Sequence, residues 1–176
     1  MEPCKFFRAD KRDFSVGDTV ASAGEFLAKN PPASSDIERA FEDKRPKNLP
    51  PRAECLYVFE YLEDANKHWS KMTGGKLYEV TVQPGDILHR ADMSLVDSAY
   101  VSRSVPHEVA ACAQRYWSGE CGSKPVIEVL VKSAQVSAVI SRDEQERKAF
   151  FKSWALVGHA QQGVQADAPA PGGSAA

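Results

Sequence analysis

Apolar residues recur at helical spacing in four segments of the chain. The clearest example runs from Pro106, a proline suited to a first helical turn, to Gly119, with its apolar residues on one face. Two further segments open with a serine followed three residues later by a glutamate, which is the capping-box signature of a helix start. The four predicted helices cover residues 35–41, 62–72, 106–117 and 142–157.

Segments rich in β-branched and aromatic residues fill the spaces between these helices and predict strands. The expected strands are Lys5–Ala9, Glu54–Glu60, Lys76–Val82, Asp86–Asp92, Val126–Lys132 and Gln135–Ile140. Two prolines in Asn30–Ser35 and three in Arg45–Pro51 predict loops. Strands and helices do not alternate regularly, so a doubly wound parallel sheet is excluded. The expected fold class is α+β, with a split, mostly antiparallel sheet and flanking helices.

The composition indicates one globular domain. The chain has 176 residues, of which 43% are hydrophobic and 26% charged, which excludes a disordered, collagen-like or disulfide-stapled protein. The last sixteen residues hold almost nothing to bury. We therefore expect a domain over residues 1–158 and a disordered Ala/Gly/Pro-rich tail over residues 159–176.

Charge and motifs narrow the function classes. A net charge of -2 does not favour a nucleic-acid binder that works by bulk electrostatics. The sequence has no apolar run long enough for a membrane helix, no secretory signal and no phosphate-binding glycine loop. We expect a reduced, cytoplasmic protein without a metal site, because its four cysteines lie far apart: Cys4, Cys55, Cys112 and Cys121.

Glu128 is the most informative position. It lies inside PVIEVLV, an almost uninterrupted apolar strand, where alternation places it on one face with Val126 and Leu130. A carboxylate in this setting has to meet water, find a partner or cost several kcal/mol of desolvation. It is either an edge-strand glutamate that faces solvent or a carboxylate on the floor of a ligand cleft.

Arg8 and Tyr57 are the other two candidates. Arg8 shares a strand face with Cys4 and Phe6, and it either pairs with a nearby aspartate, Asp10 or Asp13, or clamps a phosphate or ribose. Tyr57 belongs to an alternating stripe of residues 55, 57, 59 and 61. Such a stripe is either core packing or a flat surface for a heteroaromatic ring.

Several segments in fixed order resemble a known superfamily. CLYVFEYLEDANKHW is similar to the tyrosine-bearing strand and helix of the rifampin ADP-ribosyltransferases and poly(ADP-ribose) polymerases, and KLYEVTVQPGDILHRADMSLVD is similar to the strand pair that follows. NLPPRAECLYVFE, EDANKHW, QRYWSGE and PVIEVLV more closely resemble the bacterial domain-of-unknown-function family 2441, which is grouped with the ADP-ribosyltransferases by fold. The resemblance covers about residues 4–140.

The resemblance implies an NAD-dependent ADP-ribosyltransferase with a single ADP-ribosyltransferase-like domain. ADP-ribose would pass from NAD, the co-substrate, to an unidentified macromolecular or small-molecule acceptor, and nicotinamide would leave. By position, Arg8 would hold the NAD ribose and phosphate, Tyr57 would stack on nicotinamide, and Phe7 and Phe59 would also bind the cofactor. Glu128 would be the catalytic residue that stabilises oxocarbenium-like charge.

The sequence also departs from the superfamily. An Arg-Tyr-Glu set mixes its two usual triads, His-Tyr-Glu and Arg-Ser-Glu, and the position two before Glu128 holds Val126 in place of glutamine or glutamate. Two alternatives therefore stay open. One is a non-catalytic nucleotide- or partner-binding module on the same fold, and the other is an NAD glycohydrolase.

Overall fold

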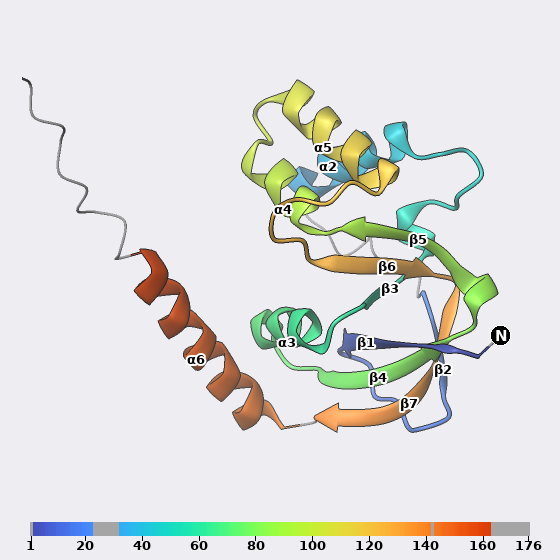
Figure 1. The fold of residues 1–176 in the computed structure, drawn as a ribbon, viewed down its shortest axis with the longest axis vertical. Helices are drawn as coiled ribbons and strands as arrows, with labels where there is room; N and C mark the ends of the chain where they lie inside the picture. Colours follow the sequence, from blue (N-terminus) through green and yellow to red (C-terminus); the bar gives the residue numbers. More distant parts are fainter. Residues whose placement is uncertain (1, 23–31, 142, 163–176) are drawn as a thin grey trace, which may run out of the picture.

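A seven-stranded antiparallel sheet forms the centre of the molecule (Figure 1). The computed structural model describes residues 2–22, 32–141 and 143–162. In spatial order the strands are β2 (Thr19–Ala21), β7 (Ser133–Ser141), β4 (Lys76–Val82), β1 (Cys4–Asp10), β3 (Leu56–Phe59), β6 (Ile127–Val131) and β5 (Ile87–Asp92). The expected α+β class and mostly antiparallel sheet are confirmed.

The pairing between β1 and β3 is the shortest in the sheet. These strands share one register pair, Phe7 with Phe59, whereas β1 and β4 pair along their whole length. Phe59 in turn pairs with Glu128 on β6. Because residues that pair across antiparallel strands share a face, these three side chains lie on the same side of the sheet.

Five helices lie in the described residues, and four of them correspond to the helices predicted from the sequence. They are α2 (Pro32–Lys44), α3 (Leu62–Lys71), α4 (Ser94–Val101), α5 (Pro106–Ser118) and α6 (Glu144–Gln162), and short 3₁₀ turns cover Arg52–Glu54 (η1) and Pro84–Asp86 (η2). Gly119 ends α5 with φ of 74°, a left-handed conformation that glycine adopts without steric cost.

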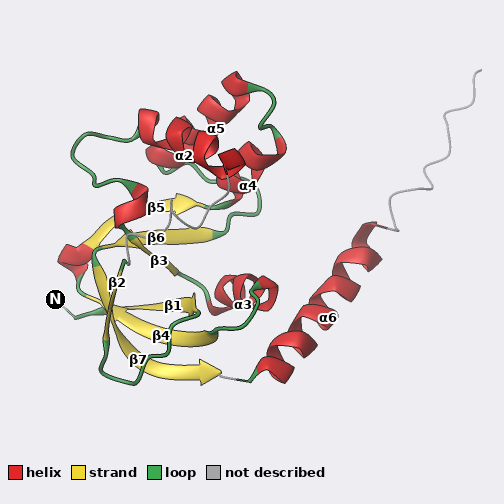
Figure 2. Cartoon of the chain, turned by 180° about the vertical axis from the view of Figure 1, so that it is seen from behind, coloured by secondary structure: helices red, strands yellow, loops and turns green. Residues whose placement is uncertain are grey.

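Two helical groups cover one face of the sheet (Figures 1 and 2). Helices α2, α4 and α5 lie together over β5 and β6, around a buried core that includes Phe41, Tyr116 and Leu130. Helix α3 packs on the β1–β4 part of the same face through Trp69, next to Phe59. The opposite face carries a separate aliphatic and aromatic core, which contains Phe6 and Val129.

Some expectations need correction. Residues 32–35 belong to α2 and not to a loop, because Pro32 occupies the helix start that proline tolerates. The short elements β2 and α4 were not expected from the sequence. Helix α6 continues to Gln162, beyond the predicted domain end at 158, and residues 163–176 lie outside the described part of the chain. The Arg45–Pro51 loop is confirmed.

Candidate functional site

Arg8 is held by its own strand and the neighbouring one. Its guanidinium donates from Nε and Nη2 to Asp10 Oδ2 at 2.8 and 2.6 Å, and from Nη1 to the Tyr57 carbonyl at 2.5 Å. Arg12 also donates to the Asp10 carboxylate. Burial alone would raise the pKa of Asp10, but hydrogen bonds from Arg12 and the charge of Arg8 outweigh it and hold the pKa at about 2. Of the two roles considered for Arg8, the pairing with Asp10 is confirmed.

Glu128 lies on the other face of the sheet from Arg8. Phe7 shares the face of Glu128 through the Phe7–Phe59–Glu128 row, and Arg8 is the next residue, so its side chain points the opposite way. The three strands that carry the predicted site are therefore neighbours. The structure brings the strands together, but it does not bring the Arg8 guanidinium to the Glu128 carboxylate.

The Glu128 side chain is enclosed, with 4% of its surface exposed. Tyr116 on α5 donates its hydroxyl to Glu128 Oε1 at 2.6 Å, and Arg52 Nη2 lies 3.5 Å from the same oxygen. Burial, followed by the Glu128 charge, raises the pKa of Tyr116 well above its ordinary value, which keeps the phenol a proton donor. Glu128 has thus found partners instead of meeting water.

Arg52, in η1, is the centre of this cluster and was not singled out from the sequence. Its guanidinium carbon lies 4.5 Å from the ring centre of Tyr116, 5.0 Å from that of Phe41 and 5.5 Å from that of Tyr57. Its Nε lies 3.4 Å from Glu38 Oε2 on α2. We call Arg52, Glu38, Glu128, Tyr57 and Tyr116 the Arg52 cluster.

Tyr57 is half-buried, and its ring lies against the Arg52 guanidinium. Its hydroxyl donates to the Arg52 carbonyl at 2.7 Å, and burial raises the pKa of the phenol. An arginine, a tyrosine and a glutamate do come together on this face, but the arginine is Arg52 in place of Arg8. The predicted cofactor residues Phe7 and Phe59 lie on the same face, in the small core around Trp69.

The Arg52 cluster contains more acidic than basic side chains. Two buried carboxylates, those of Glu38 and Glu128, share one guanidinium, and each of the three residues is at most 4% exposed. Among the described residues, Glu38 Oε1 and Arg52 Nε and Nη1 have no hydrogen-bond partner. Burial raises the pKa of Glu38, the Arg52 charge opposes this, and the charges of Glu128 and Glu42 raise it further.

We therefore expect Glu38→Gln to be at least as stable as the wild type at pH 7. Because the folded pKa of Glu38 lies above its ordinary 4.5, its contribution to stability is complete below that pH and is lost as the pH rises through the folded value. The amide introduced in the Glu38→Gln protein stays neutral, so this loss does not occur. Urea unfolding of both proteins between pH 4.5 and 8 measures the difference in their unfolding free energies.

The control for Glu38→Gln is Glu54→Gln, at an exposed position in η1. Because Glu54 is exposed, this second substitution should change the unfolding free energy at pH 7 by less than about 0.5 kcal/mol. A Glu38→Gln protein that is less stable than the wild type at pH 7 and unchanged at pH 4.5 would contradict the assignment.

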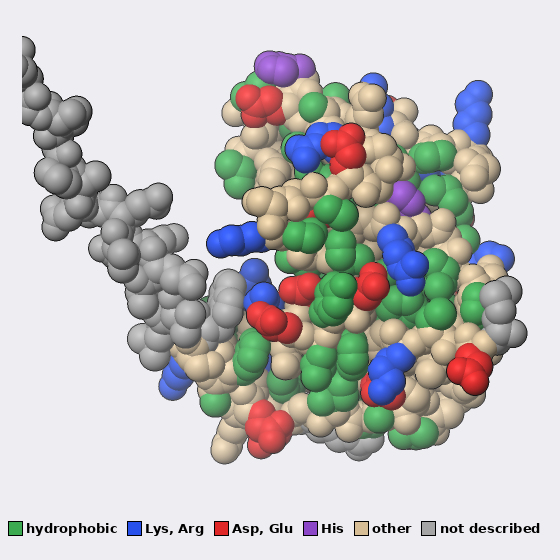
Figure 3. Space-filling view, viewed as in Figure 1, with side chains coloured by type: hydrophobic (Ala, Val, Ile, Leu, Met, Phe, Trp, Pro, Cys, Tyr) green, Lys and Arg blue, Asp and Glu red, His purple; other side chains and the backbone are tan. Residues whose placement is uncertain are grey.

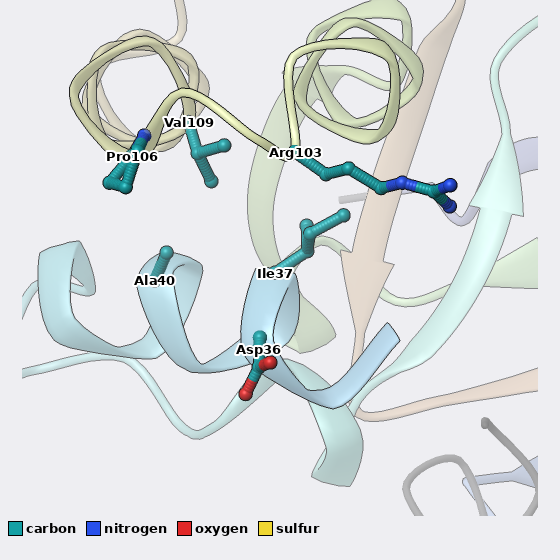
Figure 4. Close-up of a pocket in the computed structure, with 6 residues that line it drawn as sticks. All are labelled: Asp36, Ile37, Ala40, Arg103, Pro106 and Val109. Atoms are coloured by element: carbon teal, nitrogen blue, oxygen red, sulfur yellow. The ribbon is translucent and has the colours of Figure 1, made fainter. Parts of the chain in front are cut away.

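A pocket opens beside this cluster, within the helical layer (Figure 4). Its volume is about 380 Å³. The residues that line it come from α2, the α4–α5 connection and α5: Asp36, Ile37, Ala40, Arg103, Pro106 and Val109. It shares no lining residue with the Arg52 cluster.

Charge on the surface is mixed. On the face in Figure 3, acidic and basic side chains are interspersed and no single-sign patch dominates. In the described ranges, no three His, Cys, Asp or Glu residues are grouped so that they could hold a metal ion. Across the same ranges, no helix is both long and apolar enough to cross a membrane.

Most of the chain matches the model of a protein family. Residues 23–147 match the family described as protein of unknown function (DUF2441). No curated protein matches the sequence significantly. The matched range contains β3, β6, α2 and α5, and with them every member of the Arg52 cluster. Since the match spans more than half of the 176 residues, the chain belongs to the DUF2441 family.

Proposed function

We propose that this chain is a non-catalytic binding module, one of the alternatives left open by its sequence. The observation that carries the proposal is the enclosure of Glu128, which is 4% exposed and held by Tyr116 and Arg52. A carboxylate that stabilises a developing positive charge has to lie against the reacting sugar. The partners of this carboxylate are instead side chains from η1 and α5.

The placement of Arg8 supports the same proposal. All three nitrogens of its guanidinium already donate hydrogen bonds, to Asp10 and to the Tyr57 carbonyl, and its side chain is 17% exposed. It also lies on the face opposite to Glu128. One dinucleotide would have to pass through the sheet to contact the Arg8 guanidinium and the Glu128 carboxylate together.

The second candidate is an NAD-dependent ADP-ribosyltransferase, or an NAD glycohydrolase with the same site. It is favoured by the adjacency of β1, β3 and β6, the strands that carry Arg8, Tyr57 and Glu128. NAD would be the co-substrate. Glu128 would stabilise the charge that develops as nicotinamide leaves, and Tyr57 and Arg8 would hold the nicotinamide and the ribose phosphate.

Nicotinamide release from NAD separates the two candidates. The purified protein and Glu128→Gln are incubated with NAD, with and without a bacterial lysate, and NAD binding is measured by calorimetry. We expect neither protein to release nicotinamide above the level of the lysate alone. Release by the wild type that disappears in a folded Glu128→Gln protein would overturn the proposal and establish the second candidate. If that release needs lysate, the reaction is transfer; if it does not, the reaction is hydrolysis or self-modification.

A further inference from the structure

The pocket in the helical layer is built by two pairs of apolar residues that face each other. Ile37 and Ala40 lie one turn apart on α2, and Pro106 and Val109 lie one turn apart on α5. Figure 4 shows Ala40 pointing across the gap towards α5 and Ile37 pointing towards Arg103 in the α4–α5 connection. Its volume of about 380 Å³ falls in the range of roughly 300–1,000 Å³ that small-molecule sites occupy.

The charges at the pocket are not symmetric. Asp36 points away from the gap in Figure 4, and its Oδ1 lies 3.2 Å from Arg39 Nη1, so a guanidinium already balances its charge. In the view of Figure 4, Arg103 extends past Ile37, and its guanidinium lies on the side of Ile37 opposite to Ala40 and Pro106. Within the described part of the chain, Arg103 forms no salt bridge. A ligand in the gap would therefore meet an apolar floor and one positive charge.

We propose that this pocket binds a small amphipathic carboxylate, with its apolar body between α2 and α5 and its anionic group at Arg103. The proposal rests on the proposed function, because it names the ligand class that the binding module takes. A guanidinium at the rim of an apolar pocket favours a carboxylate over a neutral group of the same shape. Because Arg103 lies at the rim, the bound anion would stay in contact with water, and the free-energy cost of desolvating it would be small.

Octanoate and octanol test the proposal as a pair with the same chain and different charge. Each is titrated into the ¹⁵N-labelled full-length protein, and the amide shifts of Ala40 and Val109 are followed by NMR. We expect saturable shifts with octanoate. Octanol should bind roughly fivefold more weakly, the factor expected for an exposed ion pair.

Three variants locate the site. Arg103→Gln should weaken octanoate by about fivefold and leave octanol unchanged, because only the charge pair is lost. Ala40→Leu should abolish saturable binding of both probes, since the added carbons fill the gap. Ala111→Leu makes the same chemical change at an exposed position of α5 and should alter neither titration. Thermal unfolding of each variant verifies that it is folded.

Each of three outcomes would overturn the inference. If octanoate causes no saturable shift at the pocket residues, the pocket is not a carboxylate site. If octanol binds as tightly as octanoate, or Arg103→Gln leaves octanoate unaffected, the anionic ligand class is wrong. None of these outcomes depends on Glu128, so the test of the pocket and the test of the proposed function are separate. Nicotinamide release that disappears in Glu128→Gln would overturn the binding-module proposal. Failure of octanoate to bind would overturn only the inference about the pocket.

Discussion

Replacing Arg52 with methionine will lower the free energy of unfolding by about 4 kcal/mol at pH 7, within the range for breaking a buried ion pair. The substitution leaves the carboxylates of Glu38 and Glu128 buried together without a cation. Methionine still fills the space among the rings of Phe41, Tyr57 and Tyr116. The backbone bonds of residue 52, which do not involve the guanidinium, are also kept. The loss therefore measures charge and not packing.

The loss caused by Arg52→Met should shrink as the pH falls. Burial raises the pKa of Glu38 and the Arg52 charge opposes this, so removal of the guanidinium raises that pKa further. A carboxyl group with a raised folded pKa costs stability only once it ionises. Urea unfolding at pH 5 and pH 8 should show a smaller difference from the wild type at pH 5.

Arg115→Met is the control for this prediction. Arg115 is exposed on α5 and pairs with Glu120, so we expect a change within about 0.5 kcal/mol at either pH. If Arg52→Met costs as little as Arg115→Met, the Arg52 cluster does not hold the helical layer to the sheet. If its cost is equal at pH 5 and pH 8, the carboxylates are not the source of the loss.

The central role of Arg52 shows where sequence reasoning reached its limit. The embedded glutamate of PVIEVLV indicated that Glu128 has to meet water, find a partner or cost stability, and alternation predicts the face on which it lies. The interpretation as an edge-strand glutamate that faces solvent is wrong, because β6 lies between β3 and β5 and Glu128 is 4% exposed. Its partner Arg52 lies in PPRAECLY, a few residues before β3. This segment has no helical or strand periodicity from which the direction of a side chain could be predicted. Only the pairing of β3 with β6 brings that arginine over Glu128.

The triad of Arg8, Tyr57 and Glu128 was assigned from the resemblance by position along the chain. Position along the chain does not determine the face of the sheet to which a side chain points. Arg8 and Glu128 are on neighbouring halves of one sheet, yet the register Phe7–Phe59–Glu128 sends them to opposite faces. A shift of one residue in that register would reverse the result. Register depends on contacts between distant segments, so the sequence of either strand alone could not supply it.

Elements with strong local signals were predicted well, and elements without them were missed. The Pro106-to-Gly119 pattern predicted α5 closely because a proline start, an apolar stripe and a glycine end all agree. Strand β2 has three residues, too few for an alternating pattern, and forms through its pairing with β7. Helix α4 has eight residues and directly follows β5, and the predicted elements left residues 94–101 unassigned.

Asp92 is the position where we expect the second large effect. It is 0% exposed at the end of β5, and its carboxylate accepts three backbone N–H groups. Oδ1 accepts from Ser94 at 2.9 Å and Val126 at 3.0 Å, and Oδ2 accepts from Gly122 at 2.8 Å. One side chain thus fixes both the start of α4 and the loop that leads into β6, the strand that carries Glu128.

Asp92→Ala should lower the free energy of unfolding by about 3 kcal/mol at pH 7, because three backbone donors lose a charged acceptor at once. Asp92→Asn should cost about half as much. Its amide oxygen can still accept from Ser94 and Val126, but its NH₂ group faces the Gly122 N–H. Urea unfolding gives both values, and amide hydrogen exchange at Gly122 and Val126 should accelerate most in the alanine variant.

The pH dependence of Asp92 has the opposite sign to that of Glu38. Burial alone would raise the pKa of Asp92, but the N–H donors of Gly122, Ser94 and Val126 outweigh it and lower the pKa below its ordinary 3.8. Its contribution is therefore complete above that pH and is lost only as the pH falls through the folded value. Asp43→Ala, at an exposed position of α2, should change the unfolding free energy by less than about 0.5 kcal/mol. A loss in Asp92→Ala no larger than in Asp43→Ala would mean that the loop into β6 is held by its other contacts, and that the setting of Glu128 does not depend on Asp92.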